Sequence, residues 1–140
     1  MGSTDNAIHV WDVVSRLVAH TLTGHTHKVK SVAWDGSGER LATGSSDKTA
    51  RIWDVLTGET RLTLMGHSGS VGSVAWDSTG TYLATGSDDS TVRIWDVNTG
   101  QCLAILHTDA VVLAVAWSSD GQWLALGCFD GRMLWVRVRV

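Results

Sequence analysis

Residue types that could carry out hydrolysis recur in this sequence at a fixed spacing. A histidine, a hydroxyl and a carboxylate occur as His25, Thr43 and Asp47, and a hydrolytic triad uses these same chemical groups. The set recurs 42 residues later as His67, Thr85 and Asp89. An enzyme seldom needs one triad per repeated module, so we expect both sets to be structural and the protein to be non-catalytic.

The sequence predicts no metal site and no cofactor. His25 and His27 are two residues apart without a neighbouring carboxylate or thiol cluster, which is a poor ligand spacing. Cys102 and Cys128 lie within strand-like stretches, and we expect both to be reduced thiols of a cytosolic type of protein. The Gly-rich stretches lack the helix start that a phosphate-binding loop requires.

Charge and hydropathy exclude two classes of partner. Residues 62–131 hold seven acidic side chains and one basic side chain, Arg93, whereas nucleic-acid-binding surfaces need clustered Lys and Arg. No apolar run approaches the roughly 18 residues that span a membrane, and the N-terminus does not resemble a signal peptide. We expect a cytoplasmic protein that binds neither nucleic acid nor membrane, with a nuclear location left open.

Tryptophans reveal an internal repeat. Trp-Asp-Val begins at Trp11, Trp53 and Trp95, 42 residues apart each time, and such a period indicates a repeat architecture. Each copy reads as four short strands separated by turns, which a stacked all-β fold buries on both faces. The strands predicted in the first full copy are Val29–Trp34, Arg40–Ser45, Thr49–Trp53 and Thr60–Met65. A second tryptophan series is expected to pack between the sheets: Trp34, Trp76 and Trp117.

These residues in register resemble the WD-repeat β-propeller family. The resemblance rests on Gly24-His25 and Gly66-His67, on Leu-Ala-Thr-Gly-Ser at 41–45 and 83–87, and on the turn aspartates and Trp-Asp pairs. It implies a hydrogen-bonded tetrad in each blade. An indole N–H needs an acceptor, and a hydroxyl that accepts from it can also bond a histidine. The implied tetrads are His25, Thr43, Asp47 and Trp53, followed by His67, Thr85, Asp89 and Trp95.

The repeats divide the chain into four parts. Residues 1–23 are predicted to supply the third and outer strands of a partial blade, at Ala7–Trp11 and Leu17–Leu22, with Asp5 at the spacing of the turn aspartates. Residues 24–65 and 66–106 are two full blades, and residues 107–140 are a degenerate blade that lacks its outer strand. That last blade has His107-Thr108 where Gly-His is expected and Leu126 in place of the threonine, and only Asp130 is retained. Trp135 comes one residue early and is followed by Val136 instead of Asp. We expect it to be held by apolar packing alone and to be the least stable blade.

About 13 strands, or three and a quarter blades, are too few to close as a monomer, because closed propellers need roughly four to eight blades. Either the chain is a fragment of a larger propeller, or copies assemble into one ring. We favour a homodimer in which the N-terminal outer strand of one copy pairs with the three C-terminal strands of the other.

The resemblance implies a non-catalytic protein–protein interaction scaffold whose partners are proteins or peptides. The alternative is a minimal or engineered propeller fragment whose only activity is homo-oligomeric assembly. Phe129 is predicted either to anchor a partner or to pack against Trp135. By resemblance, the partner-binding face comprises Thr26, His27, Lys28, Ser46, Lys48, Ser68, Ser70, Asp88, Ser90 and Phe129.

Overall fold

The computed structural model describes residues 6–138 and contains thirteen strands there, all of them paired in antiparallel fashion. Asp5 lies outside the described residues, so its predicted role is not addressed by the structure. No helix in the described part of the chain is long and apolar enough to cross a membrane.

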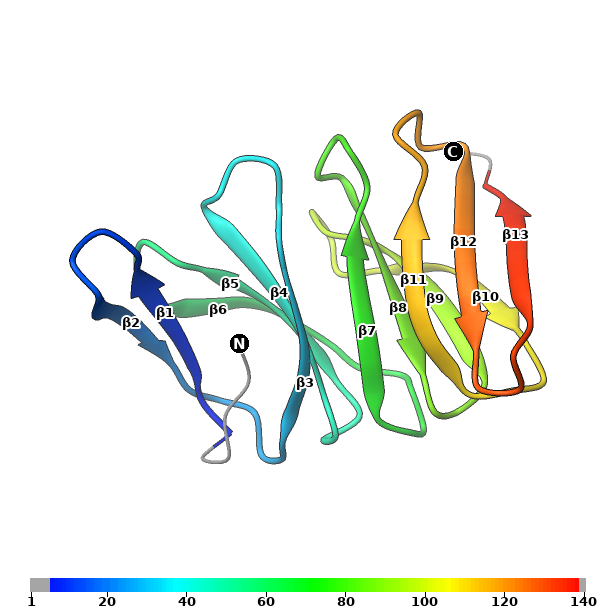
Figure 1. Cartoon of the computed structure of the whole chain (residues 1–140), viewed down its shortest axis with the longest axis horizontal. Helices are drawn as coiled ribbons and strands as arrows, with labels where there is room; N and C mark the ends of the chain where they lie inside the picture. The colour runs from blue at the N-terminus through cyan, green and yellow to red at the C-terminus, as the bar shows by residue number, and fades with distance from the viewer. Residues whose placement is uncertain (1–5, 139–140) are drawn as a thin grey trace.

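Four sheets follow one another along the chain (Figure 1). The first is a pair, β1 (Ile8–Asp12) and β2 (Leu17–Leu22). The second contains β3 (Val29–Trp34), β4 (Arg40–Ser45), β5 (Ala50–Asp54) and β6 (Glu59–Leu64). The third contains β7 (Val71–Trp76), β8 (Tyr82–Ser87), β9 (Thr91–Asp96) and β10 (Cys102–His107). The last contains β11 (Val112–Trp117), β12 (Trp123–Cys128) and β13 (Met133–Arg137).

Strand register is the same in the three larger sheets. Leu41 pairs with Trp53, Leu83 with Trp95, and Leu124 with Val136. Because side chains alternate between the two faces of a strand, Trp53 faces the preceding sheet and its neighbour Ile52 faces the following one. Val136 therefore occupies the tetrad tryptophan position, and Trp135 faces away from the rest of the molecule.

Adjacent sheets are joined by packing and by a repeated tryptophan hydrogen bond. The indole N–H of Trp76 donates to the carbonyl of Ala33 over 2.9 Å, and that of Trp117 donates to the carbonyl of Ala75 over 3.0 Å. Gly44 permits the close approach, because a Cβ there would lie 2.7 Å from the carbonyl oxygen of Val71. Three apolar clusters fill the spaces between the four sheets.

The predicted fold class is confirmed: the chain is all-β, with four-stranded antiparallel sheets and no closed propeller. Some strand bounds differ from the prediction by one residue, as at Ala50–Asp54 for the predicted Thr49–Trp53 and at Glu59–Leu64 for the predicted Thr60–Met65. The differences arise because turn residues carry no apolar alternation that would fix the strand ends.

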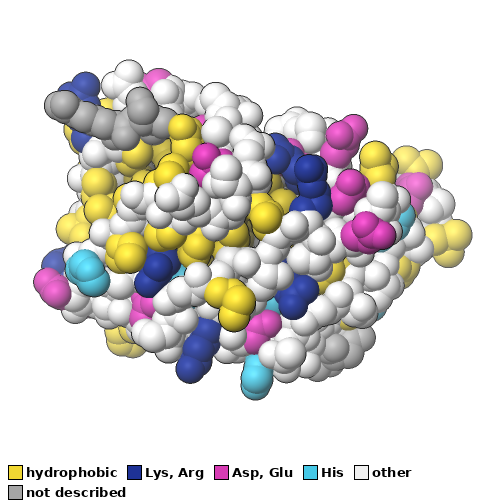
Figure 2. Space-filling view, turned by 180° about the vertical axis from the view of Figure 1, so that it is seen from behind, with side chains coloured by type: hydrophobic (Ala, Val, Ile, Leu, Met, Phe, Trp, Pro, Cys, Tyr) yellow, Lys and Arg dark blue, Asp and Glu magenta, His cyan; other side chains and the backbone are white. Residues whose placement is uncertain are grey.

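One packing prediction was wrong at the N-terminal end of the stack. Trp34 is 48% exposed, whereas Trp76 and Trp117 are partly buried against the preceding sheet. The sheet before Trp34 consists of β1 and β2, which lack the inner strand that would cover its indole. Apolar side chains also reach the surface toward both ends of the molecule when it is viewed from behind (Figure 2).

Candidate functional site

His25 lies at the centre of a buried network in the sheet β3–β6. Its Nδ1 lies 2.7 Å from Asp47 Oδ2, and its Nε2 lies 2.6 Å from Thr43 Oγ1. The indole N–H of Trp53 donates to the same hydroxyl oxygen over 2.9 Å. Asp47 also accepts a hydrogen bond from the Thr49 hydroxyl over 2.6 Å. The structure therefore brings the four implied tetrad residues together and adds Thr49.

The sheet β7–β10 contains a second network of the same kind. His67 Nδ1 lies 2.9 Å from Asp89 Oδ2, and His67 Nε2 lies 2.7 Å from Thr85 Oγ1. Trp95 donates its indole N–H to Thr85 over 2.9 Å, and the Thr91 hydroxyl donates to Asp89 over 2.6 Å. The 42-residue repeat thus reproduces the side-chain geometry as well as the strands.

One proton arrangement satisfies every group in each network. A neutral His25 with its proton on Nδ1 donates to Asp47 and accepts the Thr43 hydroxyl proton on Nε2. The Thr43 oxygen is then free to accept from Trp53. Since buried polar groups are costly when unpaired, this arrangement makes the network rigid.

The pKa values fit that arrangement. Burial would raise the pKa of Asp47, but hydrogen bonds from Thr49 and His25 outweigh it and lower the pKa to about 2. The pKa of Asp89 is lowered to about 2 in the same way: bonds from Thr91 and His67 outweigh its burial. Burial lowers the pKa of both histidines below 6.5 by more than their aspartate partners raise it. Both carboxylates are therefore charged and both imidazoles are neutral at pH 7.

The geometry argues against hydrolysis at these sites. The threonine of each set, Thr43 or Thr85, is 0% exposed, so no substrate carbonyl can reach the hydroxyl. Each hydroxyl is also occupied by an indole and an imidazole. What the networks do is tie the loop that carries the histidine to the turn that carries the aspartate.

The sheet β11–β13 has no such network. Leu126 and Val136 occupy the positions of the tetrad threonine and tryptophan, and Asp130 is exposed, with the Arg132 Nε 2.6 Å from its carboxylate. The prediction that apolar packing alone holds this sheet was wrong. The Thr108 hydroxyl lies 2.9 Å from the carbonyl oxygen of Ser90, and Arg132 Nη2 donates to the carbonyl of Thr108 over 2.6 Å.

Comparison with known families agrees with these repeated networks. The model of the family described as WD domain, G-beta repeat matches residues 17–54, 58–96 and 100–134, which together make up more than half of the chain. The chain belongs to the WD40 repeat family. WD40 domains generally act as protein-interaction scaffolds and are usually non-catalytic. No curated protein matches the chain.

In this WD40 chain the predicted partner-binding residues lie along one rim, the lower edge in Figure 1. Equivalent backbone bonds fix the loops there: Ser46 N–H donates to the Lys28 carbonyl over 2.8 Å, and Asp88 N–H donates to the Ser70 carbonyl over 3.0 Å. Phe129 on this rim is 75% exposed, so it does not pack against Trp135. The remaining rim residues are exposed or partly exposed: Thr26, His27, Lys28, Ser46, Lys48, Ser68, Ser70, Asp88 and Ser90.

Sequence reasoning missed several arginines that support the blades. Arg40 joins two sheets, because its Nε donates to Asp35 over 2.8 Å, its Nη2 donates to the Gly80 carbonyl over 3.0 Å, and its guanidinium lies 4.9 Å from the Trp76 ring centroid. Arg40 has no counterpart in the other copies, so the repeat gives no signal for it. Arg51 and Arg93 do recur in register, and that recurrence was the signal available for their packing against Gly24 and Gly66.

Among the described residues no group of three or more His, Cys, Asp or Glu side chains is arranged to hold a metal ion. His27 is exposed and hydrogen-bonded to its neighbour Thr26.

Proposed function

We propose that this chain is a non-catalytic protein-interaction scaffold that completes its propeller by self-association. The scaffold role is supported by the pair of buried networks. These networks hold the rim loops on rigid blades, while the side chains of the loops remain in solvent. A rigid scaffold with adaptable loops is a common arrangement for binding sites.

The rim offers a mixed chemistry that suits a protein or peptide partner. Lys28 and Lys48 are exposed on one blade, Asp88 is exposed on the next, and Phe129 projects from the last. An exposed aromatic among polar residues is a typical anchor of a protein interface. We propose that Phe129 enters an apolar pocket of the partner while the charged side chains orient it.

A matched pair of variants tests the rim. Phe129→Ala removes the anchor, whereas Leu56→Ala removes a 70% exposed apolar side chain from a β5–β6 loop outside the rim set. Proteins captured from cell extract by the wild type should bind Leu56→Ala equally and lose affinity for Phe129→Ala, with unchanged melting temperatures. Equal binding by all three forms would refute the anchor, and capture of nothing would refute the scaffold.

The two open ends of the stack of sheets support the proposed self-association. At one end Leu113, Met133 and Trp135 are more than half exposed, and Trp11 is similarly exposed at the other end. Large contiguous apolar patches on a soluble protein usually mark an interface. A sedimentation mass of one chain, 15.1 kDa, at micromolar concentration would refute self-association.

The same open ends favour the alternative, a minimal propeller fragment whose only activity is homo-oligomeric assembly. It predicts the same assembly but no loss of binding in the Phe129→Ala variant, because there is no partner to lose. We further propose a cytoplasmic location for either form, since Cys102 and Cys128 are both free thiols, although a nuclear location would fit them equally.

A further inference from the structure

The tryptophan hydrogen bond between neighbouring blades repeats along the stack. Each end of the stack holds one partner of a further bond of this kind, a donor at the N-terminal end and an acceptor at the C-terminal end. Trp76 donates to the carbonyl of Ala33, and Trp117 donates to the carbonyl of Ala75. The next donor in the series toward the N-terminus is Trp34, whose indole N–H makes no hydrogen bond within the described residues. The next acceptor toward the C-terminus is the carbonyl of Ala116, which no indole reaches in the part of the chain that the structure describes.

The outer face of β11–β13 keeps the small residues that covered faces use for close packing. Gly44 and Gly86 are covered so tightly that a Cβ would lie 2.7 Å from an atom of Val71 or Val112. Gly127 has the same register, yet a Cβ there would meet only Ala114, at 3.9 Å. A hollow of about 160 Å³ remains on this face, lined by Ala114, Ala116, Ala125, Gly127 and Met133 among others.

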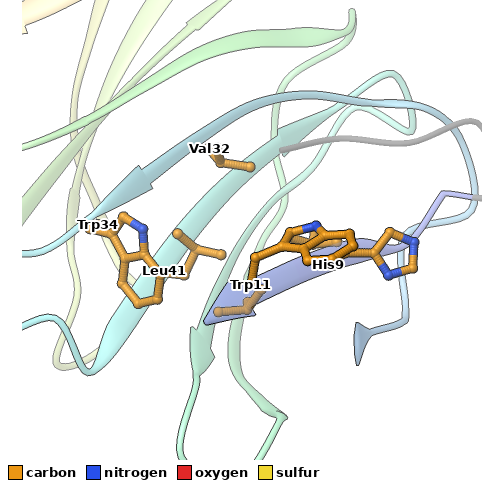
Figure 3. Close-up of a pocket in the computed structure, with 7 residues that line it drawn as sticks. His9, Trp11, Val32, Trp34 and Leu41 are labelled. Atoms are coloured by element: carbon orange, nitrogen blue, oxygen red, sulfur yellow. The ribbon is translucent and has the colours of Figure 1, made fainter. Parts of the chain in front are cut away.

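The opposite end of the stack presents the complementary side chains. In the covered interfaces the hollow is filled by valines of the next inner strand, such as Val74 of β7 and Val115 of β11. Val32 is the equivalent valine of β3. It lies beside Trp34 in a hollow of about 190 Å³ between β1 and the strands β3 and β4 (Figure 3).

We propose that a second copy of this chain docks the β3–β4 end of its stack on the outer face of β11–β13. This inference rests on the proposed self-association and specifies its contacts. Val32 of the second copy fills the hollow at Ala125 and Gly127, and its Trp34 indole donates to the carbonyl of Ala116. Each contact repeats one that already joins two sheets within the chain.

In this dimer one blade is shared between the two copies, because a strand of the second copy joins β11–β13. The residue types at the tetrad positions decide which strand that is. β1 and β13 are both third strands of a blade, so only one of them can pair with β12. Trp11 of β1 would place its indole against Leu126, which offers no acceptor, whereas Val136 of β13 matches that apolar position. β13 therefore stays with β12, and β2 of the second copy adds along the free edge of β13 in place of β1.

The number of blades per chain then favours a ring of two copies. With β1 displaced, each chain contributes twelve of its thirteen strands, which is three blades. One copy falls below the roughly four to eight blades of closed propellers, two copies give about six, and three copies would give about nine. The partner implied by this surface is a second copy in a closed dimer.

Gly127→Leu tests the docking face without disturbing the separate chain. The backbone at Gly127 is not in the left-handed region and the new side chain points into open space, so the fold should be unaffected. Gly72→Leu is the matched control, since a Cβ at Gly72 would have nothing within 4 Å and the equivalent residue of β11 is leucine. Sedimentation equilibrium should give two chain masses for the wild type and Gly72→Leu, and one for Gly127→Leu.

The outcomes separate this inference from the proposed function. A wild-type mass of one chain refutes self-association altogether. A Gly127→Leu variant that still assembles leaves self-association standing but refutes this docking face. Trp34→Phe is the second measurement: it removes two indole hydrogen bonds, one at each of the two interfaces of the closed dimer, and should raise the dimer dissociation constant about tenfold to a hundredfold. An unchanged dissociation constant for Trp34→Phe would also overturn the inference, even if Gly127→Leu failed to fold.

Discussion

The sheets β7–β10 and β11–β13 have the same strand register and very different interiors. In β7–β10 a histidine, a threonine and a tryptophan share hydrogen bonds below 3 Å. In β11–β13 the equivalent positions hold Thr108, Leu126 and Val136. Leu126 and Val136 are both apolar, so the threonine and tryptophan positions hold no buried side-chain donor without an acceptor. A network of this kind is either complete or absent, because a partial one leaves costly unpaired groups.

The largest expected effect comes from breaking the network in the second full blade. Thr85→Val keeps the shape but leaves the Trp95 indole and the His67 imidazole without their shared partner. We expect a loss of about 2–4 kcal/mol in the free energy of unfolding, measured by urea denaturation. Leu126→Val, at the equivalent position of the last sheet, should cost only about 1 kcal/mol. Equal losses would show that the network adds nothing beyond packing.

A smaller effect is expected from introducing the tetrad hydroxyl alone into the sheet β11–β13, which has no such network. Leu126→Thr buries a hydroxyl whose register partner on β13 is Leu134, and Val136 holds the position of the tetrad tryptophan. Neither side chain offers a donor or an acceptor. The expected cost is about 2 kcal/mol, from lost apolar packing and an unpaired hydroxyl. The same denaturation assay measures it, and a neutral result would mean that the site recruits a polar partner that the fold does not show.

Acid should weaken the networked sheets in two steps. Because burial lowers the pKa of His25 and His67 below 6.5, the unfolded chain binds more protons as the pH falls through 6.5, and stability falls with it. Asp47 and Asp89 contribute stability that is complete above their unfolded pKa of 3.8 and is lost as the pH falls toward about 2. The free energy of unfolding should therefore decline from pH 7 to pH 5, and His67→Gln should remove about half of that slope. A slope that His67→Gln leaves unchanged would assign the effect to other groups.

The smallest effect is expected at the aspartate that the last sheet retains. Asp130→Asn removes an exposed ion pair with Arg132, and exposed pairs contribute little. The unfolding midpoint should stay the same within error, whereas Asp89→Asn should lower it clearly. A large shift in Asp130→Asn would mean that the turn it closes supports the whole sheet.

The sequence predicts the features that repeat and misses those that occur once. The strands follow from the 42-residue period, and the resemblance to the WD-repeat family implies both tetrads, whose members recur in register. Thr108, Arg132 and Arg40 could not be assigned in this way, since each has a role in a single blade. The exposure of Trp34 was also mispredicted, because its burial depends on a neighbouring strand that the periodic pattern does not supply.

The indole bonds of Trp76 and Trp117 make the molecule a linear array in which each blade touches only its immediate neighbours. Such an array loses order from its ends, since a terminal unit has one interface to break and an internal unit has two. Amide exchange should therefore be slowest in the two internal sheets, β3–β6 and β7–β10, and faster toward both termini while the chain is alone. Closing a ring would abolish the ends, and protection would become nearly even around the circle.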